Sequence, residues 1–444
     1  MLNIYSVAQA QAKILRRDRA LEPDVPPAVK AGILRVFKEP LSPEAAVRRI
    51  LQDIRQRGDT ALWEWTARID GVRLESLFVD QEAISAAASR LPTDLLSALH
   101  LSATRIRAFH SQQPIRSWMT ADGQLGQRIV PLQRVGVYVP GGTAPLPSSL
   151  LMGAIPAQVA GVPEIIVATP PGKDGRVPDV ILAAAHLIGI ETIIPLGGAQ
   201  AVGAMAFGTE SISRVDKIVG PGNLFVTLAK QQVYGLVGID GLYGPTETAV
   251  VADETANPAW VAADLLAQAE HDLLATAILF TPSRPLAEAV QAEVARQLEE
   301  LPRAEVIAAA LSHQGGIVLT ESVAQAAQLA SEFAPEHLCI ATANPQEWVE
   351  HIHNAGGIFL GERSFEVLGD YVAGPSHVMP TSGTARFASP LSVVDFVKII
   401  SLINLSDATS AELCGPAERL AQAEGLMGHG MAARKRGETE RLRD

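Results

Sequence analysis

The stretch Arg134-Val-Gly-Val-Tyr-Val-Pro140 is a short β-rich run that ends at two glycines, Gly141 and Gly142. A helix-compatible segment follows at residues 148–160, and the same alternation continues along the chain. The next predicted strands are 165–169, 192–195 and 217–219, and the next predicted helices are 177–188, 200–207 and one that starts at 224. Short apolar strands that alternate with helices indicate βαβ units and a largely parallel sheet.

A second alternation of the same kind follows the first, although no sequence repeat links the two. Its predicted strands are 248–253, 275–281, 316–320, 337–342 and 357–360, with helices between them such as 258–270 and 285–298. The first hundred-odd residues are mainly helical, with an N-cap at Ser42 followed by Pro43. Residues 395–403 and 411–434 also look helical. The sequence therefore predicts two related sheet domains with helical segments before and after them.

The composition is that of an ordinary globular protein: of 444 residues, 48% are hydrophobic and 19% charged. The 36 basic and 48 acidic side chains give a formal charge of −12, which argues against a large nucleic-acid footprint because such a footprint needs a basic face. No secretory signal is visible at the start, and no uninterrupted apolar run approaches the ~20 residues of a membrane span. Two cysteines, Cys339 and Cys414, fit a reducing compartment better than a disulfide framework. We therefore expect a cytoplasmic protein with no nucleic-acid or membrane partner.

Three glycine-rich corners follow strands in the first α/β half. They are Pro140-Gly141-Gly142, Gly197-Gly198-Ala199-Gln200 and Gly220-Pro221-Gly222-Asn223. Glycines between a strand and a helix let backbone N–H groups approach a phosphate. None of the three completes G-x-G-x-x-G, because Phe225 stands where the third glycine of the last corner would fall. Each corner alone is compatible with a simple turn; the three together favour a nucleotide site, and both readings stay open.

Several polar side chains stand at the ends of predicted elements. Gln268 and His271 are three residues apart, hence on one helical face, and could offer an oxygen and a nitrogen to one cation. The alternative is a solvated helix end. Asp370 and His377 fall in a Gly/Pro-rich loop after the strand 357–360, where a parallel sheet displays functional side chains. Asp370 could complete a set of nitrogen and oxygen ligands that suits zinc or a similar divalent ion.

Glu336 and His337 are adjacent at the start of a predicted strand. Imidazole is the usual base near neutral pH, and a glutamate can orient or activate a water molecule. The alternative is a surface glutamate followed by a half-buried histidine, which the spacing alone does not exclude.

Several long blocks of the chain resemble the histidinol dehydrogenase family, and in order they cover nearly all of it, from about residue 29 to residue 429. They are Val135-Gly-Val-Tyr-Val-Pro-Gly-Gly-Thr-Ala-Pro-Leu-Pro-Ser148, Gly197-Gly-Ala-Gln-Ala, Lys217-Ile-Val-Gly-Pro-Gly-Asn223, Asp264-Leu-Leu-Ala-Gln-Ala-Glu-His271, Ala334-Pro-Glu-His337, Gly369-Asp-Tyr-Val-Ala-Gly374 and Ser376-His-Val-Met-Pro-Thr381. The resemblance implies oxidation of L-histidinol to L-histidine through an aldehyde, in histidine biosynthesis, with two NAD used for the two oxidations and one zinc ion at each site.

The resemblance also implies roles for individual residues. It places zinc on Gln268, His271, Asp370 and His429, catalysis on Glu336 and His337, further substrate contacts on Thr246, His377 and Glu424, and NAD contacts on Tyr138, Gln200 and Asn223. The zinc ligands and His337 belong to the substrate-binding set as well. We expect His337 to act as the base in both oxidations and Glu336 to activate water for the second. The resemblance further implies an intertwined homodimer, in which the C-terminal segment with Glu424 and His429 completes the site of the neighbouring subunit.

For the architecture, the resemblance implies an α/β fold with two Rossmann-like domains, whose mostly parallel sheets are incomplete versions of that fold, a helical N-terminal arm and a helical C-terminal tail. The expected limits are 1–30 for the arm, 31–133 with 246–390 for the first α/β domain with the catalytic and zinc residues, 134–245 for the NAD-binding second domain, and 391–444 for the tail.

The sequence departs from the family pattern at Thr246, in Gly244-Pro245-Thr246-Glu247, where the family usually has serine. Threonine keeps the hydroxyl and adds a methyl group, so a small change in substrate fit is compatible with it. Two alternatives therefore remain: a related zinc- and NAD-dependent dehydrogenase of another polar alcohol, or a catalytically silent binding protein. Retention of both Glu336 and His337 argues against the second.

Overall fold

The computed structural model describes residues 2–17, 25–141 and 145–441. The chain forms two compact units, a larger one from residues 1–113 and 132–396 and a smaller one from 114–131 and 397–444. In the described residues no helix is long and apolar enough to cross a membrane. Gly142 of the first glycine-rich corner and parts of the predicted arm and tail lie outside the described residues.

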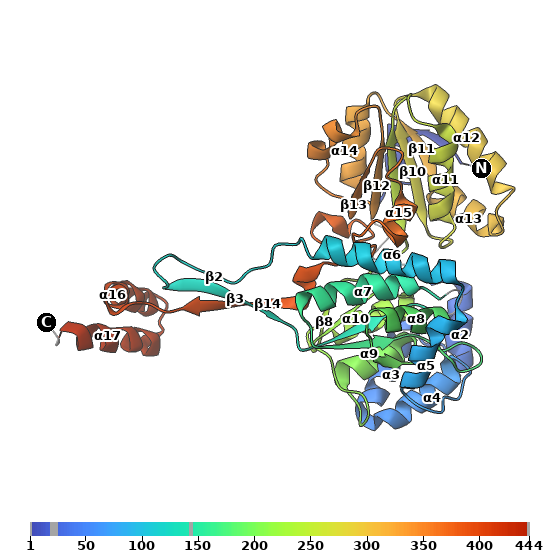
Figure 1. Ribbon diagram of the computed structural model, residues 1–444. Coiled ribbons are helices and arrows are strands. Elements are labelled where there is room, and N and C mark those ends of the chain that lie inside the picture. Colours follow the sequence, from blue (N-terminus) through green and yellow to red (C-terminus); the bar gives the residue numbers. More distant parts are fainter. Residues whose placement is uncertain (1, 18–24, 142–144, 442–444) are drawn as a thin grey trace. The chain divides into compact units, whose positions relative to one another are not determined.

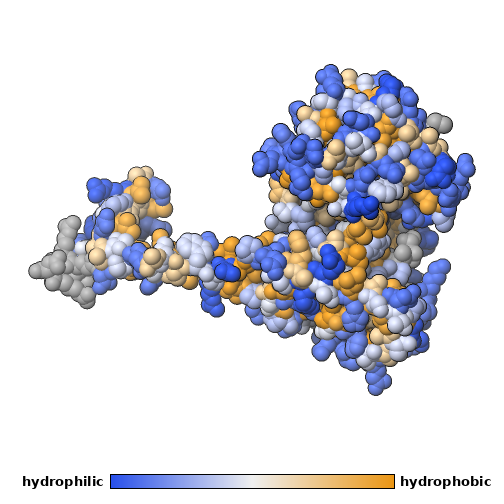
Figure 2. All heavy atoms as spheres, turned by 45° about the horizontal axis from the view of Figure 1, so that its top comes forward, coloured by the Kyte–Doolittle hydropathy of each residue, from blue (hydrophilic) through white to orange (hydrophobic). Residues whose placement is uncertain are grey.

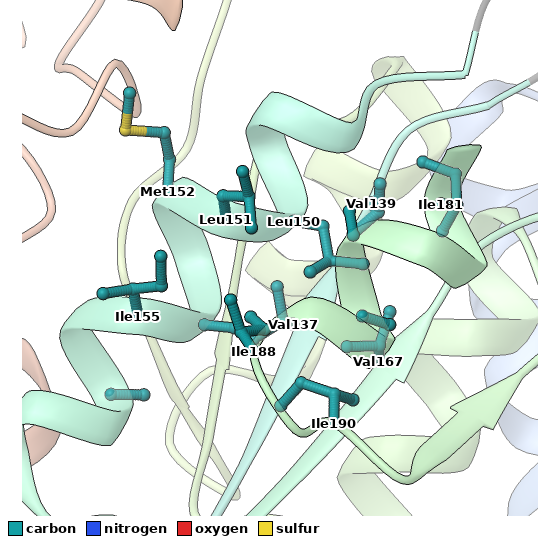
Figure 3. Packing of buried hydrophobic residues seen from close by; sticks show 14 of the residues in the cluster. Val137, Val139, Leu150, Leu151, Met152, Ile155, Val167, Ile181, Ile188 and Ile190 are labelled. Carbon is teal, nitrogen blue, oxygen red and sulfur yellow. The ribbon is translucent and has the colours of Figure 1, made fainter. Parts of the chain in front are cut away.

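One sheet of the larger unit has five parallel strands, and the predicted glycine-rich corners follow three of these strands. Figure 1 shows the helices that lie around this sheet. The strand order is β6 (Thr192–Ile194), β5 (Glu164–Ala168), β4 (Arg134–Tyr138), β7 (Lys217–Val219) and β8 (Gly238–Ile239). Alternate strand residues point to opposite faces. One face packs against α7 (Pro147–Ala160) and α8 (Asp179–Leu187), and the other against α9 (Gly198–Phe207) and α10 (Leu224–Val233). Figure 3 shows the first face, where Val137 and Val167 lie among side chains of α7 and α8.

The N-terminal helices form a second layer over the five-stranded sheet. They are α2 (Pro27–Phe37), α3 (Pro43–Arg57), α4 (Asp59–Ile69), α5 (Gln81–Ala87) and α6 (Thr93–His110). α3 and α4 join the core on the α9 and α10 side, whereas α5 and α6 join the core on the α7 and α8 side. The predicted division grouped residues 31–133 with residues 246–390 instead. The difference arises because an apolar helix face shows that a helix is buried, but not which of two sheets buries it.

The other sheet of the larger unit has six parallel strands. Their order is β1 (Ile4–Ser6), β11 (Gly316–Leu319), β10 (Thr276–Thr281), β9 (Glu247–Ala252), β12 (His337–Ala341) and β13 (Gly357–Leu360). One face packs on α11 (Pro258–Ala269), α12 (Arg284–Leu298) and α13 (Ala304–Gln314), and the other on α1 (Val7–Ala12) and α14 (Val323–Phe333). The predicted N-terminal arm thus contributes an edge strand, β1, which the sequence did not indicate. The predicted limits of the domains themselves remain a prediction.

Apart from β1, the two sheets have the same topology. In each, the first strand along the chain is central, the second and third lie on one side of it, and the fourth and fifth on the other. This order, and the parallel pairing throughout, confirm the predicted α/β fold with two related sheets. It is the doubly wound arrangement without its sixth strand, and in such sheets ligands bind where the strand order reverses.

The smaller unit contains a three-stranded antiparallel sheet and two helices. The strands are β2 (Trp118–Met119), β3 (Leu125–Pro131) and β14 (Val397–Ile403), and the helices are α16 (Asp407–Ala423) and α17 (Met427–Arg441). The helical C-terminal tail is confirmed, but the predicted helix at 395–403 is wrong. All seven residues of β14 pair with β3. Its β-branched residues, including Ile399, Ile400 and Ile403, favour a strand, and this preference outweighs the helix-like spacing.

Candidate active site

The residues implied in catalysis lie at the amino ends of two neighbouring strands, β9 and β12. Thr246 directly precedes β9, Glu336 directly precedes β12, and His337 is the first residue of β12, paired with Thr248. The helix that follows a parallel strand runs back toward the strand's amino end. The last turn of α11 therefore returns to Thr246, where the Gln268 amide Nε2 donates to the Thr246 hydroxyl at 2.7 Å.

The carboxyl group of Glu336 is buried and held by two donors. Its Oε2 accepts hydrogen bonds from the Thr246 hydroxyl at 2.5 Å and from the backbone N–H of Glu247 at 3.0 Å. Only 7% of Glu336 and 3% of His337 is exposed, so the interpretation as a surface glutamate beside a half-buried histidine is wrong. Burial raises the pKa of Glu336 to about 7. This carboxyl group can therefore gain or lose a proton near neutral pH.

The His337 ring has one nitrogen fixed and one free. Nδ1 lies 3.2 Å from the carbonyl oxygen of Glu247, and a carbonyl only accepts, so in the neutral ring Nδ1 carries the hydrogen. Nε2 is buried and has no hydrogen-bond partner among the described residues; Oδ1 of Asp370, at 3.6 Å, is too far for one. The neutral ring thus presents an unprotonated Nε2, which is the arrangement that a general base needs.

Carboxylates surround His337 and control its protonation. Burial lowers the pKa of His337, but the carboxyl groups of Glu366, Glu336 and Asp370 outweigh it and raise the pKa well above its usual value. Glu366 Oε1 lies 3.9 Å from Nδ1, and burial raises the pKa of Glu366 to about 7. These carboxylates therefore favour the protonated form of the ring.

His377 is fixed in one tautomer by hydrogen bonds to both ring nitrogens. Nδ1 donates to the backbone carbonyl of Asp370 at 2.8 Å, so Nε2 accepts from the Ser149 hydroxyl at 3.2 Å. Burial lowers the pKa of His377, which favours this neutral ring. Ser149 belongs to α7 of the five-stranded sheet, so elements packed on both sheets contribute to the site.

A cavity of about 210 Å³ brings the predicted residues together. Those that line it are Thr246, His271, Glu336, His337, Asp370 and His377. Asp370 was expected in a loop beyond the carboxyl end of a strand. It lies instead on the short helix α15 (Glu366–Tyr371), where it approaches the first residue of β12, so that expectation was wrong.

The donors beside this cavity suit a divalent cation of the zinc type. Oε1 of Gln268 is buried without a hydrogen-bond partner in the described part of the chain, because the amide nitrogen of Gln268 is used by Thr246. Burial lowers the pKa of His271, which keeps its imidazole neutral. Burial raises the pKa of Asp370, but His337 outweighs it, so the net shift is downward and the carboxylate stays charged. The described residues hold no cluster of three or more His, Cys, Asp or Glu side chains arranged for a metal. The donor chemistry nevertheless fits, because the amide of Gln268 would supply the third ligand.

A second cavity, of about 630 Å³, opens at the carboxyl ends of the strands of the five-stranded sheet. Tyr138, Gln200 and Asn223 all line it, together with Gly141, Gly197 and Gly198. The Gly198 N–H, at the start of α9, donates to the Tyr138 hydroxyl at 3.1 Å. Asn223 caps α10 by accepting from two backbone N–H groups. This is the position at which doubly wound sheets bind nucleotides.

At Gly220, in the third corner, the backbone conformation by itself requires a glycine. Its φ is +113°, and a Cβ atom there would lie 2.1 Å from the carbonyl oxygen of Tyr138. The turn interpretation is therefore sufficient for Gly220. Gly141, Gly197 and Gly198, by contrast, line the cavity itself.

Sequence reasoning missed two residues of the site, Glu366 and Ser149. Glu366 is 2% exposed, and its Oε2 accepts from the hydroxyl of Thr248. It stands four residues before Asp370, on the same helical face, and this spacing was the signal available in the sequence. Ser149 carried no such signal, because its contact with His377 joins residues 228 positions apart.

Glu424 and His429 belong to the smaller unit. Glu424 ends α16, His429 lies on α17, and both side chains are exposed.

Comparison with known proteins identifies the family. The histidinol dehydrogenase family profile matches residues 38–437. Histidinol dehydrogenase of Deinococcus radiodurans is 50% identical over 439 residues, 98% of this chain and 100% of that protein. The Thermus thermophilus enzyme is 48% identical over 428 residues, 96% of this chain and 98% of that protein. The crystal structure of histidinol dehydrogenase from Elizabethkingia anophelis matches with a TM-score of 0.90 at 34% identity, over 99% of each chain. The chain belongs to the histidinol dehydrogenase family.

Proposed function

We propose that the chain carries out both oxidations that turn L-histidinol into L-histidine, and that the cavity around Glu336 and His337 is where they occur. As a member of its family the chain is an NAD-linked oxidoreductase of histidine biosynthesis that acts on histidinol. One observation carries the assignment of the site: His337, whose Nε2 has no hydrogen-bond partner among the described residues, and a carboxyl group with a pKa of about 7 line one cavity. The two oxidations need these two kinds of group.

The first oxidation requires a base for the alcohol. The hydroxyl proton of the substrate passes to Nε2 of His337 as a hydride leaves the alcohol carbon for nicotinamide, which gives the aldehyde. The Glu247 carbonyl keeps Nδ1 protonated throughout, so Nε2 is the nitrogen that accepts.

The second oxidation requires water. Glu336 takes a proton from a water molecule, whose oxygen adds to the aldehyde carbon. His337, which has by then released its first proton to solvent, takes the hydroxyl proton of this adduct as a second hydride leaves for another NAD, which gives the carboxylate. Burial of the Glu336 carboxyl group excludes bulk water and sets its pKa near the pH at which it works.

We propose that Gln268, His271 and Asp370 hold a zinc ion together with His429 of the partner subunit. When bound, the ion would hold the amino and imidazole nitrogens of the substrate and would engage Asp370, whose charge would then stabilise a protonated His337 less. Thr246 orients two members of the site at once, because its hydroxyl donates to Glu336 and accepts from Gln268.

Homodimer formation is supported by the exposure of hydrophobic side chains in the smaller unit. Ala421 is the only hydrophobic side chain among its described residues that is buried. Large hydrophobic residues are exposed instead, among them Ile403 (74%), Leu420 (67%) and Met427 (65%). Hydrophobic patches are visible on its surface in Figure 2, at the left. A unit of this kind lacks the core that stable folding needs, and a second copy of the chain would bury its apolar surface.

The free cysteines Cys339 and Cys414 suit the proposed cytoplasmic location.

The ratio of NADH formed to L-histidinol consumed tests the proposed function. We expect a ratio of two, measured by NADH absorbance and by chromatography of substrate and product. A ratio of one, with histidinaldehyde as the product, would overturn the second step. NADH from another amino alcohol but none from L-histidinol would favour a related dehydrogenase with a different substrate.

The shared site predicts a specific behaviour of two inactive variants. His429→Asn should lose bound zinc and activity together, as measured by elemental analysis and NADH production. Mixing it with His337→Asn should restore part of the activity, because one site of each mixed dimer would then have an intact set of side chains. Each variant mixed with itself is the control. Failure to recover activity after subunit exchange has been verified by native mass spectrometry would contradict the shared site.

A further inference from the structure

The larger cavity contains a carboxylate that the family resemblance did not assign. Asp70 directly follows α4 and lines the cavity with Tyr138, Gln200 and Asn223. Its Oδ2 accepts from the Gln200 amide Nε2 at 2.9 Å. A carboxylate only accepts, so Gln200 must present its NH₂ group to Asp70. Oε1 of Gln200 is left buried and without a donor in the described part of the chain.

Asp70 supplies an acidic side chain to the lining of this cavity, and the loop after the second strand of the sheet contributes none to it. In dinucleotide-binding sheets, the acidic side chain that binds the adenosine ribose follows the second strand. Here the second strand, β5, ends at Ala168 and continues as Thr169-Pro170-Pro171-Gly172. Asp70 is the only acidic side chain among the described residues that line the cavity, alongside the basic Arg35 and Lys173. It reaches the cavity from a helix outside the strand–helix units of the sheet.

The lining of the two cavities indicates which end of a dinucleotide would lie near Asp70. Pro221 lines the catalytic cavity, and Asn223, two residues later, lines the larger one, so the nicotinamide end belongs on that side. Asp70 lines the larger cavity only. To the same cavity, α2 contributes the apolar side chains of Ile33, Val36 and Phe37, which suit an adenine ring.

We propose that Asp70 binds the hydroxyl groups of the adenosine ribose and thereby selects NAD over NADP. This inference rests on the proposed NAD role of the cavity. An ionised carboxylate accepts hydrogen bonds from two ribose hydroxyls, whereas the 2′-phosphate of NADP would place like charge against it. Burial raises the pKa of Asp70 to about 6, so the group is mostly charged at neutral pH and above. The hydrogen bond from Gln200 orients the carboxylate.

An Asp70→Asn variant tests the proposal by comparison of the two dinucleotides. We expect the KM and the Kd for NAD to rise, and the preference in kcat/KM for NAD over NADP to fall by about 10- to 100-fold. A gain in kcat/KM with NADP is the decisive readout, because damage to the fold would lower activity with both. Asp70→Ser removes the same charge with a smaller side chain, and serves if the first variant does not fold.

Two further variants separate the possible failures. Asp174→Asn makes the same charge change at an exposed position that does not line the cavity, and should leave the preference unaltered. Asn223→Ala perturbs the cavity without touching Asp70. If Asn223→Ala weakens NAD binding but the Asp70 variants keep the wild-type preference, the role of Asp70 is overturned and the cavity assignment stands. If neither change affects NAD binding by calorimetry, both the cavity assignment and the role of Asp70 are overturned.

Discussion

A His337→Asn variant is expected to lose about 10²- to 10⁴-fold in kcat for both oxidations, the usual contribution of a positioned general base. Asparagine can replace the donor that the ring offers to the Glu247 carbonyl, but it has no basic nitrogen where Nε2 stands. The measurement is kcat with L-histidinol and, separately, with L-histidinaldehyde. Both should fall, because we assign the same nitrogen to both steps.

The matched control for this change is His100→Asn, on the exposed surface of α6. It should leave both rates as they are. If His337→Asn retained the kcat of the unchanged protein while binding L-histidinol normally, His337 would not be the base.

A Glu336→Gln variant should separate the two oxidations. Glutamine keeps an oxygen to accept from Thr246 and Glu247, but it cannot take a proton from water. We expect aldehyde oxidation to fall by about 10²-fold or more while alcohol oxidation falls much less. The yield of NADH per L-histidinol should then drop from two toward one. In the unchanged enzyme, the second step should weaken as the pH falls through about 7, because the carboxyl group takes up a proton there.

Glu347→Gln, at an exposed position, is the control for this second change and should keep both rates. The two steps are resolved by single-turnover experiments with each substrate. An equal loss in both oxidations would argue that Glu336 holds the site together rather than activating water.

The alternation of strands and helices predicted the α/β fold, because buried parallel strands such as β4 and β10 are nearly continuous apolar runs bounded by glycine or proline. The sequence did not reveal β1, a three-residue edge strand that pairs with β11 over 300 residues away. Local spacing predicts a helix for β14, whereas its pairing with β3 makes it a strand. Both errors concern pairing between distant segments, which local patterns do not encode.

The spacing of residues alone predicted little of the site's chemistry. The order of the family-like motifs around Glu336 and His337 predicted more. Glu336 and His337 alone were compatible with a surface pair, and only their burial and the contact of Nδ1 with Glu247 distinguish a base from a packed histidine. Contacts such as Ser149 with His377 depend on how separate elements pack. They could not be predicted without the fold.

The two sheets share one topology, but the proposed sites lie at opposite ends of their strands. This difference has a consequence for protein engineering. The proposed dinucleotide site occupies the loops at the carboxyl ends of the five-stranded sheet. In the six-stranded sheet, the proposed catalytic residues lie at the amino ends of the strands. The loops at the carboxyl ends of its strands, such as residues 253–257 and 342–344, therefore carry no proposed chemistry. Glu254 and Thr255, which are exposed in the first of these loops, are the positions at which to insert a tag, a fluorophore site or a foreign domain.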